Sequence, residues 1–221
     1  GKGILLLGDS HGIDLFGVIT SSFENPFIVG VTQGGCRPSL PIIPGCHYEG
    51  IKTFIKNNKE VFSLVVYEQA GFYLLRKEDG TKGSRKLFNG LSNSASVQDV
   101  TVDEEHVEST ARFLAELSIS LPVKWFLPRA EPHIPEDLIL KNGCEYPYSY
   151  RENQFEIFEL LDAFIEKFVA DNFDENLQAV SQNDLFKFDF PADFMSCEAI
   201  YWSDGDHLSN SGEKYFGARL P

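Results

Sequence analysis

A serine near the start of the sequence and a histidine near its end have the neighbours that acyl-transfer chemistry needs. Ser10 follows the apolar run "LLLG" and lies between Gly8 and Gly12, so a small hydroxyl residue ends a predicted buried strand. Asp204 and His207 stand together in "SDGDHLS" near the other end. A carboxylate on one ring nitrogen fixes the tautomer of a histidine, and the other nitrogen can then deprotonate a hydroxyl. Ser10, Asp204 and His207 are therefore the candidate catalytic triad.

Each of these residues also has a purely structural interpretation. Serine is a frequent N-cap residue, so Ser10 could simply begin the helix that follows it. A histidine held by a neighbouring carboxylate can equally be a packing arrangement, which would account for Asp204 and His207. Asp206 lies between these two and is the rival orienting acid, but the Asp-x-x-His spacing favours Asp204. We favour the triad because both segments occur together, one at each end of a domain-sized chain.

Alternating strands and helices must position these side chains. Short apolar runs predict β-strands over residues 3–7, 26–31, 61–67 and 123–127. Apolar residues at helical spacing predict helices over 12–22 and 48–58, from near 102, over 155–168, and after 209. This alternation predicts a mainly parallel sheet covered on both faces, which is a three-layer α/β/α sandwich. Ser10 then lies at the carboxyl end of the first strand, where such sheets bind ligands.

Two long segments are predicted as surface loops. Residues 77–96 are rich in polar residues and glycine, and residues 128–150 are rich in proline. Each is followed by a capping box that predicts a helix start: Thr101 with Glu104, and Ser149 with Glu152. The aromatic stripe along the second of these helices is interpreted as core packing.

Composition and charge restrict the class of partner. The 221 residues, of which 43% are hydrophobic, suit a single α/β domain with a substantial core. The chain carries 19 basic and 33 acidic residues, which gives a net charge of −14. Such a surface repels phosphate backbones, which excludes nucleic acid as the expected partner. The sequence has no apolar run of the length that spans a bilayer, so we expect no direct membrane insertion of this domain.

The four cysteines fit disulfides better than metal binding. There is no C-x-x-C motif and no Cys/His cluster at zinc spacing. Four cysteines allow three pairings, or four reduced thiols. Cys36 and Cys46 lie in Pro/Gly-rich loop sequence, which favours a Cys36–Cys46 bond and a second bond, Cys144–Cys197, between two late loops. Disulfides would place the domain in an oxidising compartment.

Three segments together resemble the SGNH hydrolase family. That family begins on a Gly-Asp-Ser block and ends on Asp-x-x-His, and this sequence has "GDSH" at 8–11 and "DGDHLSNSG" at 204–212. It is most similar to the SGNH domains fused behind membrane acyltransferases that O-acetylate bacterial surface polysaccharides. Those domains share a "GC-x-P" segment, which is here "TQGGCRPSLP" at 32–41. The resemblance implies an SGNH-like fold with flavodoxin-like topology.

The resemblance also implies an activity and a setting. It implies an O-acyltransferase in which Ser10 carries the acyl group and His207 takes the proton, with no metal or organic cofactor. The implied acceptor is an exported bacterial glycan such as lipopolysaccharide O-antigen, and the implied acetyl donor is delivered by a membrane acyltransferase domain. Residues 1–221 are then a single catalytic domain, the C-terminal part of a longer membrane protein, at the periplasmic or extracytoplasmic face.

Acyl transfer also needs donors for the tetrahedral oxyanion. The Ser10 N–H, at the start of a helix, is one candidate. The resemblance implies a second donor from a glycine after the second strand, which is Gly35 or Gly34. The family adds an asparagine after the third strand, but this sequence has "YEQAGFY" there. Gln69 is the candidate replacement, or an ordinary loop residue.

Two other functions remain open from the sequence. A carbohydrate O-acetyl esterase would use the same residues with water as acceptor. A catalytically silent glycan-binding module would present polysaccharide to a membrane enzyme, and the altered block at Gln69 is its best support.

The residues around the candidate site receive weaker assignments. Asp9 is expected to brace the turn, and His11 to touch the substrate. Trp125 falls in a predicted strand and is expected in the core. Tyr201 and Trp202 either line a sugar site, because aromatic faces suit carbohydrate rings, or pack in the core. Three other histidines lack matched partners and are predicted to lie on the surface: His47, His106 and His133.

Overall fold

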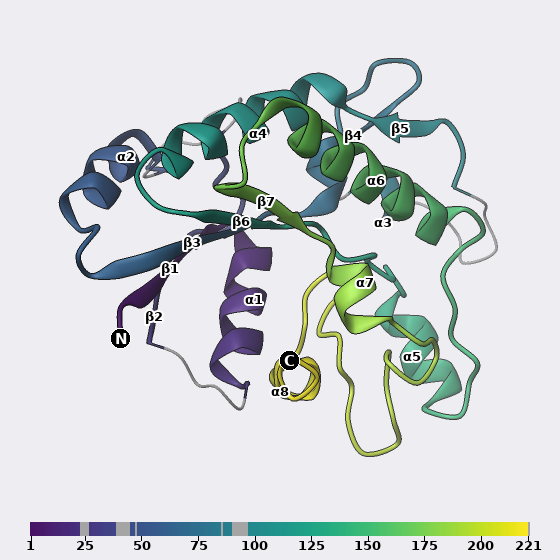
Figure 1. The fold of residues 1–221 in the computed structure, drawn as a ribbon. Helices are drawn as coiled ribbons and strands as arrows, with labels where there is room; N and C mark the ends of the chain where they lie inside the picture. Colours follow the sequence, from purple (N-terminus) through teal and green to yellow (C-terminus); the bar gives the residue numbers. More distant parts are fainter. Residues whose placement is uncertain (23–26, 39–44, 47, 85, 90–96, 221) are drawn as a thin grey trace.

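A five-stranded parallel sheet forms the centre of the molecule (Figure 1). The structure is a computed structural model, and it describes residues 1–22, 27–38, 45–46, 48–84, 86–89 and 97–220. The sheet has the strand order β2-β1-β3-β6-β7, and all of its neighbours pair in parallel. Its strands are β1 (Gly3–Gly8), β2 (Ile28–Thr32), β3 (Phe62–Glu68), β6 (Val123–Phe126) and β7 (Leu177–Val180). This is the flavodoxin-like order.

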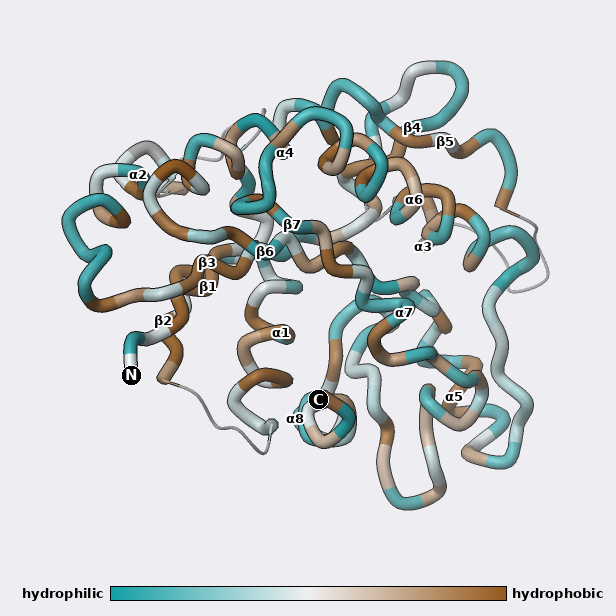
Figure 2. Tube along the Cα trace, viewed as in Figure 1, coloured by the Kyte–Doolittle hydropathy of each residue, from teal (hydrophilic) through white to brown (hydrophobic). Residues whose placement is uncertain are grey.

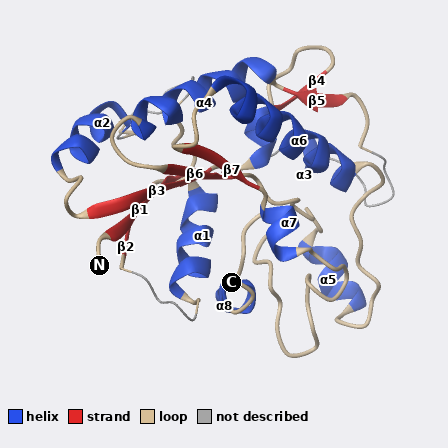
Figure 3. Ribbon diagram, in the orientation of Figure 1, coloured by secondary structure: helices blue, strands red, loops and turns tan. Residues whose placement is uncertain are grey.

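Helices cover both faces of the sheet, so the predicted three-layer sandwich is confirmed. On one face lie α2 (Tyr48–Asn57), α4 (Glu104–Ser118) and α6 (Gln154–Asn172). On the other lie α1 (Ser10–Thr20) and α8 (Asn210–Gly217), with α5 (Glu136–Asn142) and α7 (Gln182–Phe186) beside them (Figure 3).

The strands are apolar on both sides because both sides are covered. Leu5 and Leu7 of β1 belong to the core cluster under α2, α4 and α6, whereas Leu6 packs in the smaller cluster under α1. Figure 2 shows this pattern as brown strands between helices whose outer faces are largely teal. Trp125 of β6 is fully buried, so its predicted place in the core is confirmed.

Several short elements were missed by sequence reasoning. The edge strand β7 reads "LQAV", and only its first residue is fully buried, so it lacks the continuous apolar run of a central strand. The segment predicted as a polar loop includes the end of β4 (Leu75–Lys77) and α3 (Lys86–Asn89); residues 85 and 90–96 lie outside the described part. β4 follows directly after the 3-10 turn η1 (Gly71–Leu74) and pairs antiparallel with β5 (Val100–Val102). The predicted proline-rich loop contains α5.

Both predicted capping boxes are wrong, because another residue occupies the cap position. Asp103 caps α4, and its carboxylate accepts a hydrogen bond from the His106 N–H at 3.3 Å. The cap of α6 is Asn153, whose backbone is left-handed and whose side chain makes no capping bond. At α1 the cap is Asp9, which accepts from the His11 N–H at 2.9 Å. Ser10 is therefore not the N-cap of α1, which removes its main structural interpretation.

Two disulfide bonds staple the loops around the sheet. They join Cys36 to Cys46 and Cys144 to Cys197, the pairing that the sequence favoured. The second bond closes a long loop of sequence separation 53 and ties the end of α5 to the segment before the last helix. A cross-link of this kind typically adds about 2–4 kcal/mol to stability. In the described ranges, no helix combines the length and the apolarity needed to cross a bilayer.

Candidate active site

Three loops at the carboxyl ends of adjacent strands converge on Ser10. The chain runs from β1 to β2 on one side and then crosses to β3 on the other, which makes β1 the topological switch point of the sheet. Ser10 follows β1, Gly34 and Gly35 follow β2, and Gln69 follows β3. The predicted residues of the site are thus brought to one edge, as the parallel topology requires.

Asp9 ties the first of these loops to the third. Its Oδ1 caps α1, and its Oδ2 accepts from the Ala70 N–H at 3.0 Å, just beyond Gln69. The carboxylate is fully buried, and burial raises its pKa although the two N–H donors and the charge of His11 act against this. Asp9 therefore braces the turn that carries Ser10, as expected.

The first turn and the last turn of the chain are in contact. The rings of His11 and His207 lie 4.9 Å apart between centroids. The Leu208 N–H donates to Asp14 Oδ2 at 2.9 Å, which joins α1 to the residue after His207. The helices α1 and α8 also pack against each other, as Figure 1 shows. Ser10 and His207 are thereby held in one neighbourhood.

Asp204 orients the His207 ring. Its Oδ1 and Oδ2 lie 2.9 and 3.0 Å from His207 Nδ1, and Oδ1 also accepts from the His207 N–H at 3.0 Å. Asp206, the rival acid, lies 3.6 Å from the same nitrogen. Gly205 between them has a φ of 92°, a conformation that favours glycine, and this tight turn brings Asp204 back onto the ring.

The second ring nitrogen of His207 is the one a general base would use. It is buried and makes no hydrogen bond with any described residue. Ser10 is half-buried and is the first residue of α1, where its N–H has no acceptor within the helix. The described part of the chain contains no hydrogen bond between the Ser10 hydroxyl and His207. Bonds of this kind commonly tighten only with substrate in place.

A buried ion-pair cluster lies beside His207. Glu131 Oε1 is 3.0 Å from His11 Nε2, and Glu131 Oε2 is 2.7 Å from His133 Nε2. Burial by itself would lower the pKa of His11, but Glu131 raises it to about 9. The same contacts hold the pKa of Glu131 well below its usual range, against the opposing effect of burial. His11 is therefore cationic at neutral pH, and its charge opposes protonation of the adjacent His207 ring.

Arg129 joins the strands, the first helix and the loop that carries His207. Its guanidinium donates to Glu68 Oε1 at 2.9 Å, to Asp14 Oδ2, and to the Asp206 carbonyl at 3.2 Å. All of these side chains are buried. Burial raises the pKa of Glu68 to about 7 even though Arg129 lowers it. The loop that carries His207 is thus fastened to α1 through buried charge.

Solved structures of other proteins share this architecture. A carbohydrate acetylesterase from Sinorhizobium meliloti aligns with a TM-score of 0.53 and 10% identity, covering 98% of this chain and 95% of its own. A protein of the lipolytic G-D-S-L family from Veillonella parvula aligns with a TM-score of 0.49 and 13% identity, covering 99% and 96%. The C-terminal catalytic domain of peptidoglycan O-acetyltransferase A from Streptococcus pneumoniae gives 0.45 and 12%, covering 98% and 89%.

The chain has the fold of the SGNH hydrolases. No family model matches the sequence, and no curated protein matches it either. At such low identity the likeness concerns the fold, and the role of each residue has to be argued from its own surroundings.

Within the SGNH fold, the candidate oxyanion donors are N–H groups that must have no other hydrogen-bond acceptor. Gly35 has a φ of 71°, and neither its N–H nor that of Gly34 finds an acceptor among the described residues. Gln69 is fully buried; its Oε1 accepts from the Tyr67 hydroxyl, and its Nε2 has no partner among the described residues. A buried amide donor without an acceptor is costly. Gln69 therefore has the free N–H group that a third donor needs.

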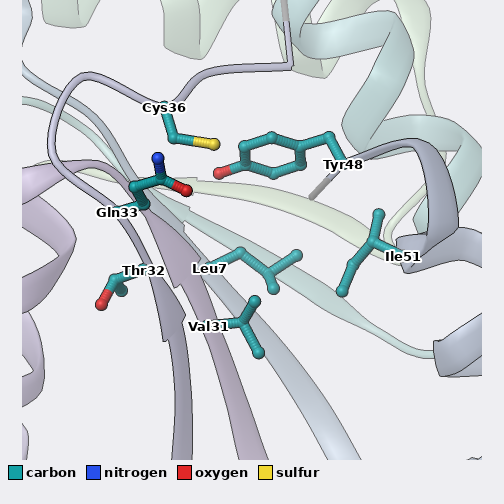
Figure 4. A pocket seen from close by; sticks show the side chains of 7 residues that line it. All are labelled: Leu7, Val31, Thr32, Gln33, Cys36, Tyr48 and Ile51. Carbon is teal, nitrogen blue, oxygen red and sulfur yellow. The ribbon is translucent and has the colours of Figure 1, made fainter. Parts of the chain in front are cut away.

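A small apolar pocket lies on the α2 side of the loop that carries Gly34 and Gly35 (Figure 4). Leu7, Val31 and Ile51 form its floor, and Cys36 covers it. The Tyr48 hydroxyl is buried beside Gln33 and has no hydrogen-bond partner in the described ranges, and burial raises the pKa of Tyr48. The pocket follows the apolar ends of β1 and β2 rather than the polar edge where Ser10 lies.

Some sequence-based assignments around the candidate site were wrong. His106 and His133 are buried instead of lying on the surface: the His106 backbone N–H donates to the capping carboxylate of Asp103, and the His133 ring is paired to Glu131. His47 lies outside the described residues. Both carboxylates are close in sequence, but their spacing to the histidines does not by itself show that the histidines are buried.

Both aromatic residues before the Asp204–His207 turn make packing contacts in the structure. Trp202 is buried, and its indole N–H donates to the Asp193 carbonyl at 3.0 Å, so it packs in the core. Tyr201 is half-buried and stacks on Tyr215 with centroids 4.3 Å apart. His11 is fully buried against Glu131, so in this structure it contacts protein rather than solvent.

Glu131 and Arg129 are the important residues that sequence reasoning missed. Both follow β6 directly, in "FLPRAEPH", so charged residues stand right after an apolar strand. The charged residues are visible in the sequence, but the proline content of this segment predicts only a loop. The partners of Arg129 and Glu131 lie far away in the chain, at Asp14, Glu68 and His11.

Imidazole and carboxylate groups converge at two places in the described part of the chain. Ligand-type atoms lie within 4.8 Å of one another in the group His11, Glu131 and Asp206 and in the group Asp204, Asp206 and His207. In the first group, Nε2 of His11 already lies 3.0 Å from Glu131 Oε1. In the second, Nδ1 of His207 is already directed at Asp204.

The pH dependence of activity should report His207. Burial alone would lower its pKa, but the hydrogen bond to Asp204, together with Asp206 and Asp14, raises it above the ordinary 6.5. Since a base must be neutral, we expect kcat/KM for p-nitrophenyl acetate to rise with pH through a midpoint above 6.5. Asp204→Asn should move that midpoint downward, because it removes the main stabiliser of the imidazolium. An unchanged midpoint in this variant would contradict the assignment of Asp204.

Proposed function

We propose that this domain is a serine-dependent O-acyltransferase that acetylates a glycan through an acyl-enzyme on Ser10. One observation carries the proposal: the turn of Ser10 meets the turn of His207, whose ring is oriented by Asp204 and whose Nε2 is unoccupied. A hydroxyl, a free imidazole nitrogen and an orienting carboxylate are the parts of a nucleophile–base–acid triad.

The chemistry proceeds in two balanced steps. In the first, the Ser10 oxygen forms a bond to the acyl carbon of the donor, His207 takes the hydroxyl proton, and that proton passes to the departing oxygen. In the second, a sugar hydroxyl attacks the acyl-enzyme, gives its proton to His207, and the bond to Ser10 breaks with return of the proton. N–H groups of Ser10, Gly34 or Gly35 and the Gln69 amide stabilise the oxyanion in both steps.

Carbohydrate O-acetyl esterase activity is the second candidate. It needs the same residues, with water in place of the sugar hydroxyl. The likeness in fold to the carbohydrate acetylesterase supports it. In both cases the substrate is an acetylated or acetylatable carbohydrate.

The setting that we propose is an extracytoplasmic one. The two disulfides support an oxidising compartment. We infer that residues 1–221 form one catalytic domain whose acetyl donor reaches it from a membrane acyltransferase domain, and that the acceptor is an exported bacterial glycan such as O-antigen.

Product analysis separates these activities. The protein is incubated with p-nitrophenyl acetate and O-antigen polysaccharide that has been de-O-acetylated with alkali. We expect ester-linked acetyl on the polysaccharide in excess of a control that contains His207→Ala. Free acetate alone, at the rate of p-nitrophenol release, would point to the esterase. Absence of p-nitrophenol release above the His207→Ala control would contradict both and favour a silent glycan-binding module.

A further inference from the structure

Two adjoining cavities open next to the orienting acid of the proposed triad. The larger, of about 270 Å³, is lined by Asp204 together with His133, Ile134, Pro135, Glu136 and Arg151. The smaller, of about 70 Å³, shares Ile134 and Arg151 with it and extends to Tyr146 and Ser149. We call the two together the Tyr146 groove. Their combined size falls near the small end of ligand sites, about 300 Å³.

The walls of the Tyr146 groove are fixed to the catalytic loop. The His133 N–H donates to the Gly205 carbonyl at 2.8 Å, within the Asp204–His207 turn. Arg151 donates to the His133 carbonyl at 2.9 Å, and the Cys144–Cys197 disulfide holds the segment after α5. The groove is therefore held in a set position relative to His207, and needs no large rearrangement to form.

The lining of the Tyr146 groove suits a carbohydrate better than an acyl chain. The Glu136 carboxylate and the Ser149 hydroxyl lie on exposed residues and can bond to sugar hydroxyls, whereas Asp204 and Arg151 already bond to neighbouring groups of the protein. Tyr146 is 40% exposed and its ring is supported edge-on by Tyr148 at 5.0 Å, so one aromatic face is available. Sugar rings combine hydroxyl groups with apolar C–H faces that pack on aromatic rings, so a sugar can contact the exposed carboxylate, the exposed hydroxyl and the tyrosine together, whereas an acyl chain offers no hydrogen bond to the first two.

We propose that the Tyr146 groove binds the carbohydrate acceptor, with a pyranose ring on Tyr146 and its chain leading past Asp204 toward His207. This inference rests on the proposed function and adds to it the place where the acceptor sits. The groove acts on the acceptor alone, so removing Tyr146 should impair the second step of the reaction and leave the first unchanged.

The test compares Tyr146→Ala with a matched control. Phe54 of α2 is 41% exposed, and its ring centroid lies 6.2 Å from that of Phe62. Phe54→Ala therefore removes an equally exposed aromatic ring that packs beside another ring elsewhere on the surface. De-O-acetylated O-antigen oligosaccharide is the acceptor, and p-nitrophenyl acetate is the donor. We expect Tyr146→Ala to lower the acceptor kcat/KM by about three- to tenfold, as the loss of one aromatic contact would do, without changing hydrolysis of p-nitrophenyl acetate alone. Phe54→Ala and Tyr146→Phe should behave as wild type.

A direct binding measurement keeps this test separate from the proposed function. Saturation-transfer NMR with the same oligosaccharide needs no catalysis, and it is run on wild type, Tyr146→Ala and Phe54→Ala. Loss of signal in Tyr146→Ala alone supports the groove, even if wild type turns over no ester and the proposed enzyme activity fails. Equal signal or equal acceptor kinetics in wild type and Tyr146→Ala overturns the groove, as does absence of any binding to wild type.

Discussion

Ser10→Ala is expected to abolish turnover of p-nitrophenyl acetate, with a loss of kcat on the order of 10⁴-fold or more. The reason is that no acyl-enzyme can form, and only the oxyanion donors and binding remain to assist attack by water. The substitution leaves the capping bond of Asp9 to the His11 N–H intact, since Asp9 is the N-cap of α1. We therefore expect the unfolding transition in urea to stay within about 0.5 kcal/mol of wild type.

Ser22→Ala is the matched control for this experiment. Ser22 lies just beyond the other end of α1, half-buried, and its hydroxyl donates to the Ile19 carbonyl at 2.7 Å. It should keep wild-type activity. If Ser10→Ala retained the wild-type rate, Ser10 would be removed from the mechanism and the observed hydrolysis would have to arise from another nucleophile.

Arg129→Met is expected to cause the largest loss of stability, about 3–5 kcal/mol in urea unfolding. It removes the only cation that the structure places against both Glu68 and Asp14 in the described part of the chain, and leaves two buried carboxylates unpaired. It also breaks the bond to the Asp206 carbonyl, so the His207 loop should loosen and kcat should fall.

Two further variants test whether the loss of stability comes from the buried ion pairs of Arg129. Arg112→Met removes an arginine that is 66% exposed and paired to Glu108 on the surface of α4, and should cost about 0.5 kcal/mol or less. Adding Asp14→Asn to Arg129→Met should restore part of the lost stability, because it neutralises a buried carboxylate that Arg129 pairs. A loss in Arg129→Met no larger than in Arg112→Met would contradict the proposed bracing role.

The central strands and the two motif segments could be predicted from the sequence because their signals are local. The run "LLLG" before Ser10 and the strand around Trp125 are apolar in succession, as buried parallel strands are. The Asp204–His207 turn is recognisable by spacing, since both partners come from one short loop. Parallel topology then requires the loops after β1, β2 and β3 to meet at one edge.

What could not be predicted depends on contacts between distant parts of the chain. Glu131 is buried as a charge against His133, its neighbour in sequence, and against His11, which comes from a distant part of the chain and is not identifiable as a partner from sequence. The strand β7 is short and half-exposed, so its apolar pattern is too weak to detect. The cap of α4 was mislocated for a different, local reason, because Asp103 competes with a nearby Thr-Glu pair that fits the motif equally well.

The most direct test of the central claim is the mass of the enzyme during turnover. Wild type is mixed with p-nitrophenyl acetate, quenched in acid within the burst, digested and sequenced by tandem mass spectrometry. We predict one added acetyl group, located on the peptide that contains Ser10, and no such group on that peptide in Ser10→Ala. Acetyl found only on another residue, with turnover undiminished in Ser10→Ala, would contradict this prediction.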